Sequence, residues 1–118
     1  MAGIHVYNRQ NETHIENNYP IYRPYLLGNP FTHIRDKETK AIYIVNSREE
    51  AINSYSHYFD VMYGSDIKFT KMVDEIYNKY KNGEDVYLEC YCHPKPCHGD
   101  IIADKLRKRL IKEKIYNR

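Results

Sequence analysis

Apolar residues along the chain are arranged as two short β-type segments and three stretches with helical spacing. Residues 4–8 predict a first strand, and residues 86–92 predict a central strand. Apolar positions three and four apart predict helices over about 48–62, from residue 65 or 66 to Asn82-Gly83, and over about 99–115. This order of elements predicts an α/β fold, a Rossmann-like compact sandwich with a mostly parallel sheet.

Local signals define the ends of these helices and their buried faces. Ser47 and Glu50 form a capping box at the start of the first helix, and Gly83 supplies a left-handed residue after the second. The apolar residues expected to face the core are Ala51, Ile52, Tyr55, Tyr58, Phe59, Met62, Phe69, Met72, Val73, Ile76, Tyr77, Tyr80, Ile102, Leu106, Leu110 and Ile115. The tyrosines among them fit either a core or a dimer contact, and a core position is favoured.

The segment between the first strand and the first helix carries turn signals and no regular period. Residues 9–18 are predicted to form a loop, and residues 22–27 a second extended piece. Gly28, Asn29 and Pro30 predict a turn in which the glycine permits a positive φ. Residues 32–35 and 40–45 predict a small β-hairpin inserted into the fold.

Length and composition restrict the class of protein. A chain of 118 residues is long enough for one core, so residues 1–118 are predicted to form a single domain. The net charge is only +2, and no apolar run approaches the ~20 residues that span a bilayer. The first residues lack the apolar segment of a signal peptide, so we expect a cytoplasmic protein without a membrane partner.

All three cysteines and two of the six histidines lie in one short segment, residues 90–98. This segment connects the predicted central strand to the last helix, and ligands of open α/β sheets bind at such connections. An odd number of cysteines does not suit a disulfide framework, so free thiols or metal ligands are favoured. The connection is therefore the strongest candidate for the functional part of the chain.

Two sequence blocks carry a family resemblance. The first is Leu-Gly-Asn-Pro-Phe at residues 27–31, and the second is Cys-x-Cys-x-Pro-x-x-Cys-His-Gly-Asp at residues 90–100, with the Arg-Glu-Glu-Ala-Ile sequence of residues 48–52 between them. With these blocks the chain resembles the domain-of-unknown-function family 4326 over most of its length. Members of that family are small bacterial and bacteriophage proteins without an established activity. At the level of fold, the chain is also similar to Rossmann-like domains that sense ADP-ribose derivatives in bacterial immunity.

The two blocks together predict a site for a small phosphate-containing ligand, such as a nucleotide or an ADP-ribose-type signalling molecule. Free N–H groups at the start of the last helix attract an anion, and Gly99 permits close approach to the backbone. His98 is a candidate donor to phosphate, and Asp100 caps the helix or accepts from a ribose hydroxyl. The residues expected to bind the ligand are Arg9, Arg23, Gly28, Asn29, Pro30, Phe31, Cys92, Cys97, His98, Gly99 and Asp100.

The first block is expected to form the opposite wall of this site. Asn29 would recognise a polar edge of the ligand, and Phe31 or Tyr25 would stack on a base. Arg9 and Arg23 are the candidate countercharges. If the chain is encoded by a phage, as the resemblance permits, sequestering a host signalling nucleotide is the hypothesis for its role in host–virus interaction.

Other functions fit the same residues. A structural zinc would take Cys92, Cys97 and His98, with Cys90 as a fourth ligand, although the Cys-x-Cys spacing is tighter than usual; no other cofactor is expected. Cys97 at a helix start would be a nucleophile with a lowered thiol pKa. A nucleotide-processing enzyme such as a glycosidic-bond hydrolase would use Asp100 or His98 as acid or base. Without any such role, Cys90 is a small core residue.

The last helix is basic, with seven Lys or Arg and one Glu from residue 105 to the end. Such an excess can bind nucleic-acid phosphates. It is more typical of a solvated helix face in a chain that is nearly neutral and has no DNA-binding motif. The expected partner is therefore a small nucleotide-like ligand and not a nucleic acid, and a homo-oligomer remains open.

Overall fold

The computed structural model describes residues 3–23, 25–32 and 43–116. Its strands are β1 (Ile4–Asn8), β2 (Asn18–Pro20), β3 (Phe31–Thr32), β4 (Tyr43–Ile44) and β5 (Val86–Cys90). Its helices are α1 (Arg48–Met62), α2 (Ile67–Lys81) and α3 (His98–Tyr116). Among the described residues β1 and β2 both pair in parallel with the central β5, which confirms the α/β class and the parallel sheet.

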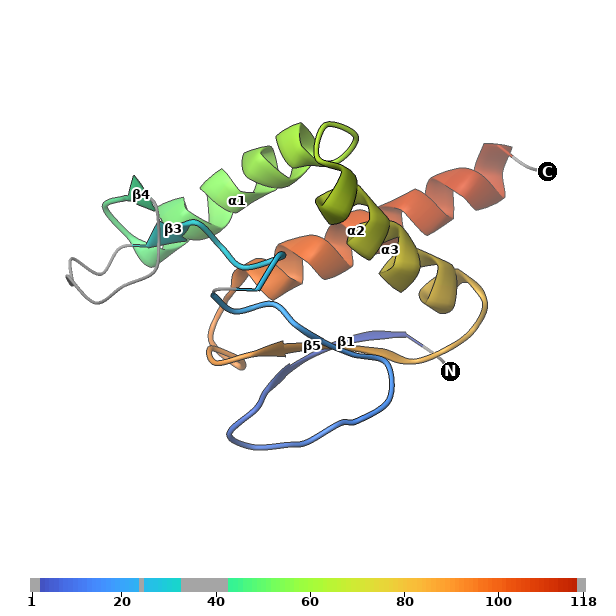
Figure 1. The fold of residues 1–118 in the computed structure, drawn as a ribbon, viewed down its shortest axis with the longest axis horizontal. Coiled ribbons are helices and arrows are strands. Elements are labelled where there is room, and N and C mark those ends of the chain that lie inside the picture. The colour runs from blue at the N-terminus through green and yellow to red at the C-terminus, as the bar shows by residue number, and fades with distance from the viewer. Residues whose placement is uncertain (1–2, 24, 33–42, 117–118) are drawn as a thin grey trace.

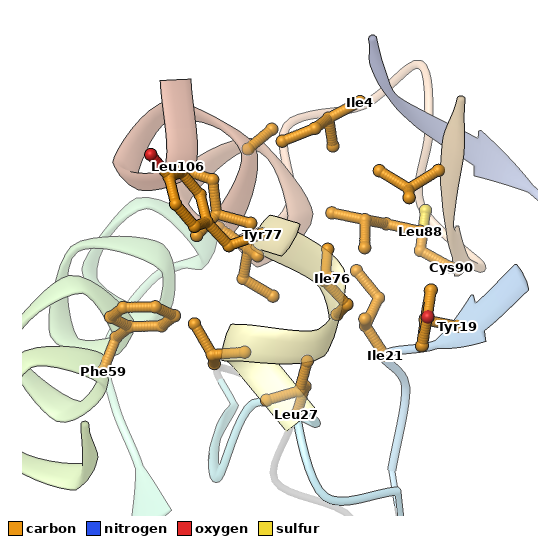
Figure 2. Packing of buried hydrophobic residues seen from close by; sticks show 14 of the residues in the cluster. Ile4, Tyr19, Ile21, Leu27, Phe59, Ile76, Tyr77, Leu88, Cys90 and Leu106 are labelled. Carbon is orange, nitrogen blue, oxygen red and sulfur yellow. The ribbon is translucent and has the colours of Figure 1, made fainter. Parts of the chain in front are cut away.

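The three described helices lie on one side of this sheet (Figure 1). Every second residue of β5 points toward them, so Val86, Leu88 and Cys90 are buried. Figure 2 shows Leu88 and Cys90 in the same cluster as Ile76 of α2 and Leu106 of α3. The core therefore fills the space between the sheet and the helices.

The capping signals place α1 and α2 as the sequence predicts. The Ser47 hydroxyl accepts a hydrogen bond from the Glu50 N–H at 3.0 Å, and α1 begins at the next residue, Arg48. The Glu50 carboxylate in turn accepts a hydrogen bond from the N–H of Asn46, one residue before the cap. Gly83 ends α2 with a φ of +92°, the left-handed conformation expected there.

Most of the residues predicted to face the core do so. Tyr55 and Tyr77 are buried, and Tyr58 and Tyr80 pack half-buried against the core, so these tyrosines need no dimer contact. Ile115 is the exception, because it is 57% exposed in the last turn of α3, where the helix has passed the end of the sheet. None of the helices in the described ranges is both long enough and apolar enough to cross a bilayer.

Three predictions about the strands are wrong. The predicted extended piece is wrong, because its described residues, 22–23 and 25–27, form bends and turns. The second strand is β2, which begins at the last residue of the predicted loop and pairs with β5. The central strand ends at Cys90, two residues early, because a turn begins there. The predicted hairpin would be antiparallel, whereas β3 pairs with β4 in parallel, with Phe31 stacked on Tyr43. The rest of the predicted hairpin, residues 33–42 with its turn, lies outside the described residues.

Candidate functional site

A pocket of about 190 Å³ opens where three segments meet. They are the loop after β2, the connection from β5 to α3, and the start of α1. The described residues that line it are Tyr22, Arg23, Asn29, Phe31, Arg48, Ala51, Ile52, Cys90, Tyr91, Cys92, Pro96, Cys97 and His98. We call it the arginine pocket. It lies beyond the carboxyl ends of parallel strands, the usual position of ligands in open α/β sheets.

The lining carries two positive charges and, among the described residues, no carboxylate. Arg23 comes from the loop after β2, and Arg48 is the first residue of α1. Within the described part of the chain, neither guanidinium has an Asp or Glu oxygen within 4.0 Å, although eight other ion pairs are formed. The pocket thus has an excess of positive charge.

Arg23 is held in place by backbone carbonyls. One of its terminal nitrogens, Nη1, donates to the carbonyls of Asn29 and Phe31, at 2.9 and 3.3 Å. Burial lowers the pKa of Arg23 because the guanidinium loses water without gaining a carboxylate partner among the described residues. An anion in the pocket would offset this desolvation.

The loop of residues 27–31 is fixed to α1 by Asn29. Its side-chain nitrogen donates to the Ala51 carbonyl at 3.1 Å, and its side-chain oxygen accepts from the Phe31 N–H at 3.0 Å. The Tyr55 hydroxyl donates to the carbonyl of Leu27 at 2.9 Å. The Asn29 amide, expected from the sequence to recognise a ligand, therefore already has partners within the protein.

Gly28 is required for a reason other than the predicted one. The described glycines with positive φ are Gly64 and Gly83, so Gly28 does not use the left-handed region. A Cβ at position 28 would instead lie 2.9 Å from the Tyr25 carbonyl oxygen and 3.2 Å from the Arg23 Cα. The glycine allows two backbone segments to touch behind the pocket wall.

Several N–H groups at the start of α3 already have partners within the protein. The Cys97 sulfur accepts from the Gly99 N–H at 3.3 Å, and the Asp100 carboxylate accepts from the Cys97 N–H at 3.2 Å. A Cβ on Gly99 would lie 2.8 Å from the Ile21 Cδ1, so this glycine is needed for packing against the core. The Gly99 N–H is therefore not free to bind an anion, and the space beside Gly99 is filled by Ile21 and not left for a ligand.

The His98 side chain connects the start of α3 to the loop after β2 through a hydrogen bond. Its Nε2 lies 2.5 Å from the Ile21 carbonyl oxygen, and a carbonyl only accepts, so Nε2 carries the proton. Burial lowers the pKa of His98 to about 4. The imidazole is therefore neutral at pH 7, and its Nε2–H is already used by the protein.

The His98 environment predicts acid sensitivity. A pKa lowered from 6.5 to about 4 means that the unfolded chain binds the proton more tightly, so the contribution of His98 is complete above pH 6.5 and is lost as the pH falls toward 4. By pH 4.5 the loss is roughly 2–3 kcal/mol. His98→Gln, which keeps a donor, is expected to lose less stability than the natural chain between pH 7 and 4.5 in urea unfolding. Equal losses in both proteins would refute the assignment.

The cysteines belong largely to the core. Cys90 and Cys97 are 1% and 3% exposed, which confirms the core position expected for Cys90. The neighbouring Cys90 thiol and burial raise the pKa of Cys97, which argues against the predicted low-pKa nucleophile at this buried position. Cys92 is half-buried and lines the pocket. No group of three or more His, Cys, Asp or Glu in the described ranges is arranged to hold a metal ion.

The structure brings six of the predicted binding residues into the lining: Arg23, Asn29, Phe31, Cys92, Cys97 and His98. Gly28, Pro30, Gly99, Asp100 and Arg9 are not part of the lining, and Arg9 contacts Tyr22 and Tyr91 beside it. The sequence reasoning missed Arg48, Tyr22 and Tyr91 as site residues. Arg48 directly follows a helix cap, but no local pattern shows that this end of α1 meets the other two segments.

The comparisons with known proteins give one match. A family model described as Domain of unknown function (DUF4326) matches residues 4–108, which include both sequence blocks and all of the pocket lining. Comparison with curated proteins found no match, and comparison with solved structures found none either. Because the family model covers most of the chain, the protein belongs to the DUF4326 family.

Proposed function

We propose that this protein binds a small phosphate-containing ligand in the arginine pocket, with Arg23 and Arg48 supplying the countercharge. The observation that carries the proposal is the pair of arginines in a lining that has no described carboxylate. A phosphate accepts two parallel bonds from a guanidinium, which makes arginine the preferred partner. The expected ligand is a nucleotide or an ADP-ribose-type molecule, as in Rossmann-like domains.

The chemistry around the pocket supports binding over turnover. A glycosidic-bond hydrolase needs an acid or base free to reach the ligand. Asp100 lies outside the lining and accepts from the Cys97 N–H, while the Nε2–H of His98 donates to Ile21. Neither residue is therefore free as a proton donor in this arrangement, which favours a sequestering protein, and a role against host signalling would follow if the gene is carried by a phage.

Isothermal titration of ADP-ribose and pyrophosphate into the protein tests the proposal. We expect both to bind, and the affinity to fall between 50 and about 300 mM salt because ion pairing is screened. Failure of both to bind at low salt would refute the proposal. The ligand recovered after denaturation distinguishes the two roles, because a sequestering protein returns it intact and an enzyme returns products.

A further inference from the structure

The arginine pocket is smaller than the ligand class proposed for it. Its volume is about 190 Å³, whereas pockets that enclose drug-sized molecules measure roughly 300–1,000 Å³. A diphosphate with its two charged groups is far smaller than a whole nucleotide. The remainder of such a ligand must therefore lie outside the pocket, against the residues at its mouth.

Three tyrosine rings lie beside that mouth, and two of them are exposed. Tyr22 and Tyr91 both line the pocket, and their ring centroids are 4.7 Å apart. Tyr25 packs edge-on against Tyr22 at 5.1 Å. Tyr91 is 47% exposed and Tyr25 is 50% exposed, so neither ring is needed to fill the core. We call these three residues the aromatic rim.

Arg9 holds the aromatic rim in one arrangement. Its guanidinium carbon lies 5.6 Å from the ring centre of Tyr22 and 5.4 Å from that of Tyr91. It also donates a hydrogen bond to the Tyr22 hydroxyl at 2.8 Å. The rim is therefore ordered before any ligand arrives. The charge of Arg9 itself is balanced by the Glu89 carboxylate, 4.0 Å from its Nη1, so the countercharge for the ligand stays with the two arginines inside the pocket.

We propose that the ligand is a nucleoside diphosphate-type molecule whose diphosphate occupies the arginine pocket and whose base stacks on the exposed ring of Tyr91. This inference rests on the proposed function, because it assumes that the pocket holds the phosphates. Stacking on an aromatic side chain suits any base, since every base has a π face. The geometry thus assigns base contact to Tyr91 instead of Phe31, whose ring is already stacked on Tyr43 at 5.1 Å.

A single-tryptophan variant tests the stacking directly. The chain contains no tryptophan, so Tyr91→Trp places the only indole at the proposed base site. We expect ADP to quench its fluorescence and pyrophosphate to leave it unchanged. Tyr116→Trp is the matched control, because Tyr116 is 83% exposed at the end of α3 and neither probe should alter its emission.

The affinities for ADP and for pyrophosphate distinguish a failure of this inference from a failure of the proposed function. Tyr91→Ala is expected to weaken ADP binding about tenfold and pyrophosphate binding much less, whereas a general loss of structure would weaken both alike. If pyrophosphate binds and ADP binds no more tightly, the stacking inference is wrong while the anion site stands. If neither probe binds the natural chain, both proposals are wrong.

Discussion

Gly28→Ala is expected to destabilise the protein by about 2–3 kcal/mol, because the new Cβ would overlap backbone atoms. The Tyr25 carbonyl oxygen would lie 2.9 Å away, and the Arg23 N and Cα would each lie 3.2 Å away. Unlike a flexible side chain, these atoms move only if the turn behind Arg23 opens. Urea unfolding at pH 7 measures the change, and the same variant should lose affinity for pyrophosphate because Arg23 is displaced.

Gly3→Ala is the matched control for this prediction. The nearest atom to a Cβ at position 3 is a side-chain carbon of His5 at 3.9 Å, so an alanine fits without overlap. The stability of this variant should stay within about 0.5 kcal/mol of the natural chain. If Gly28→Ala is as stable as Gly3→Ala, the close backbone contact is not what Gly28 provides.

Arg48→Glu is expected to weaken pyrophosphate binding at least about 100-fold, because it replaces an attractive charge in the lining with a repulsive one. The fold should be unaffected. Arg48 is half-buried at the first position of α1, whose first turn already contains Glu49 and Glu50, and acidic residues are favourable at a helix N-terminus. Isothermal titration gives the affinity, and a melting temperature within a few degrees of the natural value shows that the variant is folded.

Lys68→Glu controls for the change in net charge. Lys68 is exposed in the first turn of α2 and does not line the arginine pocket, so the substitution makes the same charge change at the same kind of helix position. It should bind pyrophosphate nearly as well as the natural chain. Equal losses in the two variants would mean that overall charge, and not Arg48, controls binding.

The sequence predicted the parts of the fold whose causes are local. A capping box defined the start of α1 at Ser47, and a left-handed glycine defined the end of α2 at Gly83. The three-residue β2 was missed because it has no signal of its own and contains Pro20. Its stability comes from pairing with β5, which is distant in the sequence.

The site was predicted only in part for the same reason. Both sequence blocks meet at the pocket, because a strand-to-helix connection and a glycine turn are visible in the sequence. Arg48 and Tyr91 could not be selected, since their roles arise from the packing of α1 and of the β5–α3 connection. Gly99 was assigned to ligand approach because a sequence cannot show that Ile21 fills the space beside it.

The central claim, that the arginine pocket binds a phosphate-bearing ligand, is tested most directly by native mass spectrometry. The natural chain and Arg48→Glu would be compared as purified and after incubation with 1 mM ADP or pyrophosphate. The account predicts a phosphate-bearing adduct of one ligand per chain in the natural protein and its loss in Arg48→Glu. A bare natural chain under every condition, or the same adduct in both proteins, would contradict it.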